Sequence, residues 1–93
     1  MTVEEIRKNV ISFVEKYNIS KIELFGSRAE GINKEFSDID LIIEFSGPVT
    51  LMKLSQLRID LEECLELDVD IIHGPIREND MIEVGRRVEL YAA

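Results

Sequence analysis

Three short apolar runs and two longer segments of helical periodicity follow one another in the order helix, strand, strand, helix, strand, and this order limits the folds that the chain can adopt. The runs at 19–25, 38–45 and 67–72 are each followed within two residues by a glycine, which is typical of β-strands. Residues 2–17 and 50–66 carry apolar side chains three and four positions apart, which predicts helices. We therefore expect an α/β (α+β) domain in which helices pack on a small mixed sheet.

The ends of two helical segments carry recognisable signals. Thr2 and Glu5 have the spacing of a capping box at the start of the first helix. Ser27 and Glu30 repeat this spacing in the connection between the first two strands. We therefore expect one helical turn there, ended by Gly31.

For the second half of the chain, the sequence leaves more than one interpretation of some segments open. Thr50 can cap the second long helix, whose leucines recur three and four positions apart. Residues 79–87 are predicted as a short helix, and 88–91 as a last strand or a helical end. The leucine stripe and the C-terminal segment are candidates for the core or for a partner interface, and we expect a homodimer or a hetero-oligomer. The stripe consists of Leu51, Leu54, Leu57, Leu61 and Leu65.

The length, net charge and cysteine content of the chain exclude several classes of function. With 93 residues, the chain is expected to form one domain spanning 1–93. It has 11 Lys and Arg against 19 Asp and Glu, and this net charge of −8 disfavours a nucleic-acid partner. The single cysteine, Cys64, excludes an intrachain disulfide and a Cys-rich zinc site. The first residues are charged and no apolar run has the length of a membrane span, so we expect a cytoplasmic protein with no membrane partner.

Two aspartates, Asp38 and Asp40, lie two positions apart on the predicted strand 38–45. Residues at this spacing project from the same face, with α-carbons about 6.6 Å apart. Their carboxylates would repel each other unless a divalent cation bound both. Hard oxygen ligands favour Mg²⁺, with Mn²⁺ as the alternative ion. The alternative interpretation of the pair is an exposed polar strand face.

A third carboxylate on the next predicted strand can join this pair. Asp70 has apolar neighbours on both sides, and Asp68, which shares its parity, is the rival candidate. We rank Asp70 first because Asp68 lies nearer the start of the strand. A two-metal site needs several carboxylates, and three aspartates meet that requirement.

The residues Gly26-Ser27 follow the first predicted strand and open the expected helical turn. Glycine lets the backbone approach a ligand closely, and the free N–H groups at the start of a helical turn point toward an anion. The pair therefore predicts a phosphate-binding turn, with an ordinary turn as the alternative. Beside the aspartates, it describes a site for a metal–nucleotide.

The segment Gly26-Ser27-Arg28-Ala29-Glu30-Gly31, followed by Ser37-Asp38-Ile39-Asp40-Leu41, resembles the signature of the DNA polymerase β-like nucleotidyltransferases. Within that superfamily the chain most resembles the minimal nucleotidyltransferases, small antitoxin-like proteins paired with HEPN-domain toxins. The resemblance covers nearly the whole chain and includes the strand Val69-Asp70-Ile71-Ile72. It implies the nucleotidyltransferase fold, which is similar to the palm of polymerase β.

The resemblance also assigns roles to residues of this sequence. It implies that Asp38, Asp40 and Asp70 are catalytic carboxylates and metal ligands. It further implies that the nucleotide is bound by Gly26, Ser27, Arg28 and Ser37. Members of the family usually carry Arg or Tyr where this chain has Glu30, which leaves Arg28 and Lys34 as the nearby basic groups.

The function implied is Mg²⁺-dependent transfer of AMP from ATP to a protein hydroxyl, by the antitoxin of a HEPN toxin. The acceptor itself is not encoded in the residues, but we expect no second domain that could hold a polynucleotide. One alternative is a non-catalytic antitoxin that neutralises its partner by contact. Another is a nucleotidyltransferase acting on a small molecule.

Five other residues have weaker claims to a functional role. His73 cannot form a zinc site alone, and we expect it to be structural or solvent-facing. Cys64 is expected in the core or at its boundary, and Tyr17 as a packing residue. The pair Arg86-Arg87 is expected at a helix end, where the helix dipole favours cations.

Overall fold

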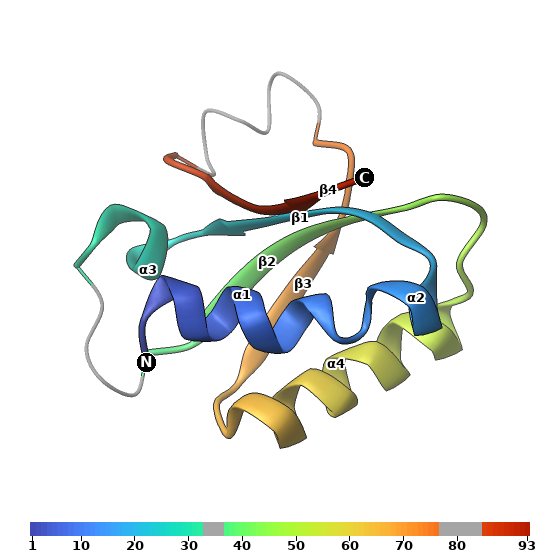
Figure 1. Ribbon diagram of the computed structural model, residues 1–93, viewed down its shortest axis with the longest axis horizontal. Coiled ribbons are helices and arrows are strands. Elements are labelled where there is room, and N and C mark those ends of the chain that lie inside the picture. The colour runs from blue at the N-terminus through green and yellow to red at the C-terminus, as the bar shows by residue number, and fades with distance from the viewer. Residues whose placement is uncertain (33–36, 77–84) are drawn as a thin grey trace.

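The computed structural model describes residues 1–32, 37–76 and 85–93, and these form a four-stranded mixed sheet with helices on one side (Figure 1). The strands lie in the order β3-β2-β1-β4. Strand β1 pairs antiparallel with β2 and β4, and β2 pairs parallel with β3. Their bounds are β1 Ile19–Phe25, β2 Ile39–Phe45, β3 Val69–His73 and β4 Val88–Ala92. The predicted mixed sheet is confirmed.

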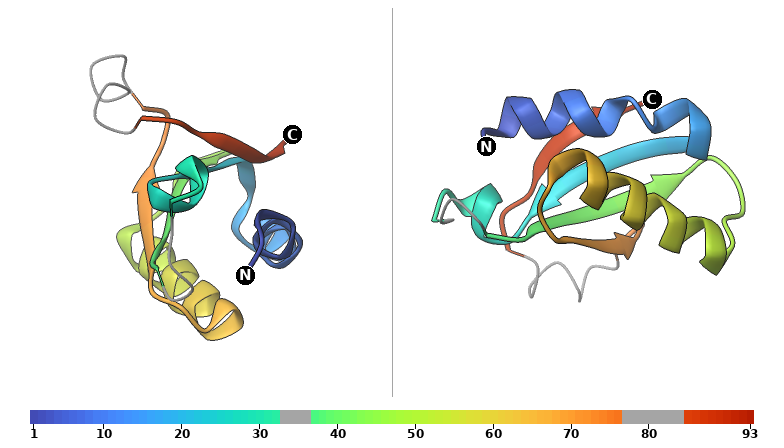
Figure 2. Two further views of the ribbon diagram at one scale, coloured as in Figure 1. Left: turned by 90° about the vertical axis from the view of Figure 1, so that its left-hand side faces the viewer. Right: turned by 90° about the horizontal axis from the view of Figure 1, so that it is seen from below.

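Helices cover one face of this sheet, with α1 and α4 side by side below it in Figure 2. The bounds are α1 Val3–Ile11, α2 Val14–Tyr17, α3 Ser27–Glu30 and α4 Leu51–Leu65. None of the helices among the described residues has the length and apolar character needed to span a membrane. The short helix α3 is set apart at the end of β1, on the edge of the sheet where the predicted site lies (Figure 1).

The first helical segment differs from the single helix predicted over residues 2–17. The capping box of Thr2 and Glu5 is present, but the helix breaks between α1 and α2. The N–H of Ser12 bonds the carbonyl of Asn9 at 3.3 Å, and the Ser12 hydroxyl donates to the same carbonyl at 2.6 Å. A serine that hydrogen-bonds locally in this way competes with the regular helical ladder.

The later elements follow the prediction with small shifts at their ends. Strand β1 has the predicted bounds, and Thr50 caps α4 by accepting from the N–H of Lys53. Strand β3 begins two residues later than predicted, because Glu66 ends α4 in a left-handed conformation, φ 57°, and the chain must still turn into the sheet. Residues 88–91 belong to strand β4. Of the helix predicted at 79–87, residues 79–84 lie outside the described residues, and residues 85–87 are not helical.

The core lies between the helices and one face of the sheet. Strand residues that alternate along β1 and β2 are fully buried there, and so is one side of α4. These residues are Ile22, Leu24, Ile39, Leu41, Ile43, Leu57, Leu61 and Leu65. Burial of each such side chain stabilises the fold by about 1.5–3 kcal/mol. The predicted leucine stripe is therefore only partly core, since its first member, Leu51, is 80% exposed.

Candidate active site

The turn between β1 and α3 is built on Gly26. Its φ of 75° and ψ of −157° lie in a region that essentially only glycine occupies. A Cβ at this position would lie 2.3 Å from Oδ2 of Asp40, so the Asp40 carboxylate packs directly against the glycine backbone. The fold thus places the predicted phosphate-binding turn in contact with one of the predicted metal ligands.

The helical turn α3 is confirmed, but its cap differs from the prediction. Gly26 occupies the N-cap position and no side chain caps the helix, so the expected capping box of Ser27 and Glu30 is wrong. Ser27 is instead the first helical residue. Gly31 ends the turn in a left-handed conformation, as expected. The glycine takes the cap position because the backbone must pass close to Asp40 at that point.

The aspartates of β2 and β3 come together through strand pairing. Asp40 lies directly opposite Asp70 in the parallel register, and both belong to the sheet face opposite the helices. The pKa of Asp40 is raised, first by burial, then by the charges of Asp70 and Asp38, and also by a hydrogen bond with Asp70. Asp38 precedes β2 and is exposed. The structure therefore gathers carboxylates that repel each other at one end of the sheet.

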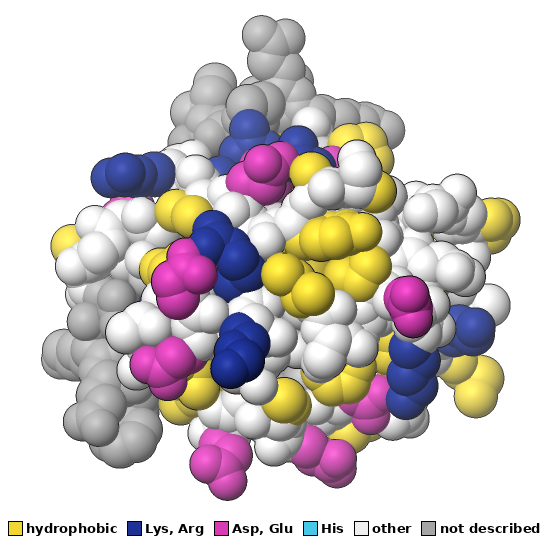
Figure 3. Space-filling model, viewed as in Figure 1, with side chains coloured by type: hydrophobic (Ala, Val, Ile, Leu, Met, Phe, Trp, Pro, Cys, Tyr) yellow, Lys and Arg dark blue, Asp and Glu magenta, His cyan; other side chains and the backbone are white. Residues whose placement is uncertain are grey.

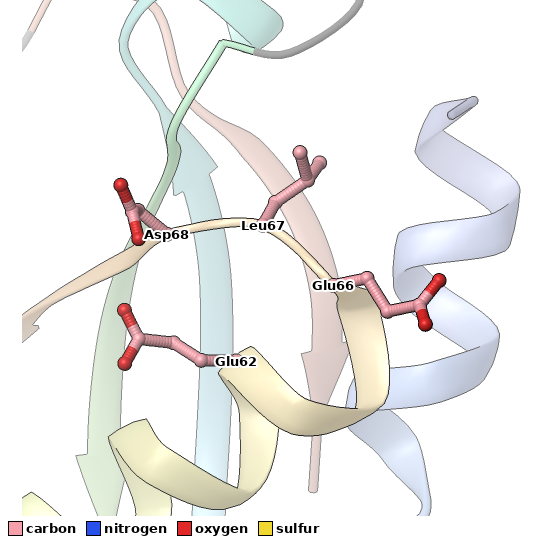
Figure 4. Close-up of a pocket in the computed structure, with 4 residues that line it drawn as sticks. All are labelled: Glu62, Glu66, Leu67 and Asp68. Atoms are coloured by element: carbon pink, nitrogen blue, oxygen red, sulfur yellow. The ribbon is translucent and has the colours of Figure 1, made fainter.

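The rival residue Asp68 lies in different surroundings. Figure 4 shows it with Glu62, Glu66 and Leu67 around a hollow where α4 leads into β3. The Glu62 carboxylate accepts a hydrogen bond from the N–H of Val69 at 3.0 Å, which ties the end of α4 to the strand. Asp70, in contrast, lies directly opposite Asp40 in the strand register, and its charge raises the pKa of Asp40. The geometry therefore favours Asp70 as the third carboxylate.

Two of the residues expected to bind nucleotide, Arg28 and Ser37, contact each other. Nη2 and Nε of Arg28 donate to the carbonyl of Ser37 at 2.9 and 3.2 Å, and Nη1 donates to the carbonyl of Met1 at 3.2 Å. The Arg28 residue is only 5% exposed. These bonds connect α3 with the residue before Asp38, so they fix the turn relative to the aspartates. Lys34, the other basic candidate, lies outside the described residues.

The three aspartates have the chemistry of a divalent-cation site, but they do not have the geometry of a complete one. In the part of the chain that the structure describes, no three His, Cys, Asp or Glu side chains converge as a formed metal centre. The pair Asp40 and Asp70 is in contact, and the exposed Asp38 lies near enough to raise the pKa of Asp40. Carboxylate oxygens held together in this way fit Mg²⁺ or Mn²⁺, whose charge would offset the repulsion.

The same sheet face carries a buried carboxylate that the sequence did not signal. Glu23 is 8% exposed and lies 3.2 Å from Nη1 of Arg87 and 3.9 Å from Nζ of Lys21. Arg87 is thus an ion-pair partner just before β4, and the expected helix end at Arg86-Arg87 is wrong. No pattern distinguished Glu23, because its burial depends on the neighbouring strand β4.

The remaining candidates lie away from these aspartates. His73 is exposed, and its ring meets the edge of Phe45 at a centroid distance of 5.4 Å. Cys64 is exposed and contacts Asn9, so its expected place in the core or at its boundary is wrong. Tyr17 is buried as expected, and its hydroxyl donates to Asp60.

Comparison with known proteins identifies the class to which this fold and site belong. Residues 8–86 match the family model of polymerase beta nucleotidyltransferases. The chain therefore belongs to the polymerase β nucleotidyltransferase family and is a nucleotidyltransferase, as the resemblance implied.

Relatives of similar length carry related names. The protein adenylyltransferase MntA of Thermococcus cleftensis is 33% identical over 76 residues, which are 77% of each chain. The protein MJ0435 of Methanocaldococcus jannaschii, a candidate protein adenylyltransferase, is 36% identical over 72 residues, again 77% of each chain.

Solved structures share the fold. A candidate minimal nucleotidyltransferase is 30% identical, with a TM-score of 0.72 and 90% of each chain covered. A toxin–antitoxin complex solved with AMP-PNP gives a TM-score of 0.78 at 20% identity, covering 94% of this chain and 73% of that one.

Proposed function

We propose that this protein transfers an adenylyl group from ATP to a hydroxyl of a partner protein, and that the partner is a HEPN-type toxin which it neutralises as an antitoxin. The observation that carries the proposal is the place of Asp40, which lies directly opposite Asp70 in the register of β2 and β3 and packs its carboxylate against the Gly26 turn. Relatives named protein adenylyltransferases support the protein acceptor. A structural neighbour is described as a tri-AMPylated HEPN toxin of Shewanella oneidensis with its MNT antitoxin, which suggests the partner.

The proposed nucleotide site begins at the turn after β1. The backbone N–H groups at Gly26 and Ser27 stand at the start of α3 and can donate to the β- and γ-phosphates of ATP. The Ser27 hydroxyl adds one donor. The Arg28 guanidinium, bonded to the carbonyl of Ser37, holds this turn beside the aspartates.

In the proposed site, Asp38, Asp40 and Asp70 hold Mg²⁺, or Mn²⁺ in its place. Bound there, the cation would supply positive charge against the phosphate oxygens of the nucleotide. The contact between Asp40 and Asp70 supports this assignment, because two carboxylates held together in a fold are otherwise unfavourable.

The transfer itself is an in-line displacement. The oxygen of the acceptor hydroxyl forms a bond to the α-phosphorus, and the bond from that phosphorus to the oxygen bridging the β-phosphate breaks. Pyrophosphate leaves, and the hydroxyl proton passes to the Asp70 carboxylate, which releases it to water. Most of the rate acceleration then comes from positioning and from neutralisation of charge.

Label transfer from α-labelled ATP to the purified HEPN partner tests the proposal. We expect Asp38→Asn and Asp40→Asn to stay folded, to bind the partner and to lose transfer by at least ~100-fold, the scale of losing a strong electrostatic stabiliser. Ser27→Ala should lose less, because the backbone donors remain.

Rescue of cells from the toxin, measured with the same variants, separates the alternatives. If the wild type transfers no label and both Asn variants rescue fully, the protein neutralises its partner by contact. If label reaches only small acceptors, the protein acceptor is wrong. We expect loss of transfer and loss of rescue to occur together.

A further inference from the structure

The first half of α4 exposes large apolar side chains that its packing leaves uncovered. Leu51 is 80% exposed, Met52 84% and Ile59 43%, whereas Leu57 and Leu61 on the other side of the helix are buried. Exposed apolar residues gathered on one helix face, rather than scattered singly, are typical of an interaction surface. Figure 3 shows hydrophobic, basic and acidic side chains beside one another at the lower right, where α4 begins.

This surface continues to the proposed active site through two adjoining hollows that share Ser55. One is lined by Leu51, Met52, Ser55, Gln56 and Ile59, and the other by Leu54, Ser55, Arg58, Asp70 and Ile71. The second hollow, of about 290 Å³, therefore has Arg58 on its helix side and Asp70 on its strand side. A molecule lying on the apolar face of α4 reaches the carboxylate that contacts Asp40.

The charges along α4 are opposite to those that would stabilise the helix. Its residues 51–59 contain Lys53 and Arg58 and no acidic residue, although the chain has a net charge of −8. The first turn of α4 holds no acidic residue and the last turn no basic one. Since the helix dipole favours the reverse arrangement, helix stability does not explain these cations. Recognition of an acidic surface does explain them.

We propose that the α4 patch, composed of Leu51, Met52, Ser55, Arg58 and Ile59, is the docking surface for the protein acceptor. The acceptor presents apolar side chains flanked by acidic residues, and its hydroxyl lies over Asp70. A second copy of this chain fits less well, because a twofold dimer through the patch would bring Lys53 and Arg58 of both copies into one interface, where residues 51–59 offer no acidic side chain to pair with them. The inference rests on the proposed function for the identity of the occupant.

Binding of the HEPN-domain protein of the same genome, purified on its own, tests the surface by calorimetry without ATP. We expect Arg58→Glu and Met52→Gln each to raise the Kd by at least about tenfold, because the first reverses the charge of the patch and the second replaces its most exposed apolar side chain. The matched controls, Lys8→Glu and Ile11→Gln, change similar exposed residues on α1 and should bind within about twofold of the wild type. Melting curves with and without Mg²⁺ and ATP check that all four variants stay folded and keep the nucleotide site.

Three outcomes would overturn the proposal. Arg58→Glu could bind as tightly as the wild type, or the controls could weaken binding as much as the patch variants. Light scattering could also show that the patch variants abolish a dimer of this chain while partner binding is unchanged. A failure of the proposed function looks different: binding depends on the patch as expected, but no label from ATP reaches the bound partner.

Discussion

On the helix-covered face of the sheet, Ile39 and Leu41 are fully buried, whereas Asp40 between them points to the opposite face and is partly exposed. The buried strand positions of the helix-covered face are apolar. The opposite face holds Glu23, Asp40 and Asp70, which are held near other charges. The comparison teaches that most of the buried apolar side chains belong to one set of alternate strand residues, whereas the charged side chains belong to the other set, which also contains the buried Ile42. Substitutions on the helix-covered face should therefore change mainly the free energy of unfolding. Substitutions of the charged residues on the opposite face should change mainly nucleotide transfer.

The largest expected effect on stability comes from the helix-covered face. Leu41→Ala removes a fully buried side chain and leaves a cavity, so we expect the free energy of unfolding to fall by about 2–5 kcal/mol. Urea denaturation followed by circular dichroism measures this loss. The matched control is Ile72→Ala on the opposite face, where the side chain is 40% exposed and the loss should be about 1 kcal/mol or less. Equal losses from the two variants would contradict the division between the faces.

Two glycines, one at each end of α3, test whether the turn after β1 positions the aspartates. Gly31 has left-handed helical angles, φ 74° and ψ 17°, so alanine there should cost about 1 kcal/mol of stability, whereas alanine at Gly26, with φ 75° and ψ −157°, should cost up to about 3 kcal/mol. An added Cβ at Gly26 meets Oδ2 of Asp40 at 2.3 Å, whereas one at Gly31 meets no atom within 4 Å. We expect Gly26→Ala to lower nucleotide transfer by about 100-fold, in line with the loss of one strong electrostatic stabiliser, and Gly31→Ala to leave it within about twofold. Similar transfer rates for the two variants would mean that the turn does not position Asp40.

The smallest effect concerns a polar contact on the helix side. The Tyr17 hydroxyl donates to Asp60, which lowers the pKa of that carboxyl, and burial with this contact raises the pKa of Tyr17 to about 12. A lowered carboxyl pKa stabilises the fold above the unfolded value of 3.8, and the gain is lost as the pH falls through the lower folded pKa. A raised tyrosine pKa stabilises the fold below 10.0, and the gain is lost between 10.0 and about 12.

Tyr17→Phe should therefore be less stable than the wild type from about pH 5 to pH 9, and the difference should shrink at both extremes. Chemical denaturation across this pH range measures it. A difference in stability that is independent of pH would show that the hydroxyl acts only through packing.

The strands and the aspartate site could be predicted because both depend on local alternation. Asp40 and Asp70 stand at strand positions that alternation places on one face, and Asp38 immediately precedes β2, so their proximity needed only the pairing of two neighbouring strands. The burial of Arg28 could not be predicted in the same way. Its partners are the main-chain carbonyls of Ser37 and Met1. Since every residue has such a carbonyl, the sequence does not indicate which ones accept from the arginine.

The side chains of α4 show the same limit on prediction. Periodicity indicated a stripe of leucines, but whether Leu51 is buried depends on how far the sheet extends under the helix. The hollow that joins Arg58 to Asp70 depends on the angle at which α4 meets β3. The break after α1 likewise follows from one serine hydroxyl, which the apolar spacing of residues 2–17 does not reveal.

The most direct test of the account is the thermal stability of the wild type and of Asp40→Asn/Asp70→Asn with and without Mg²⁺ and a non-hydrolysable ATP analogue. Without ligands, the double variant should melt at or above the wild-type temperature, because it relieves the repulsion between the two carboxylates. With Mg²⁺ and the analogue, the wild type should gain stability by mass action, by about 1.4 kcal/mol for each tenfold excess over Kd, and the double variant should gain none. Equal gains in both proteins, or no gain in the wild type, would contradict a metal–nucleotide site at Asp40 and Asp70.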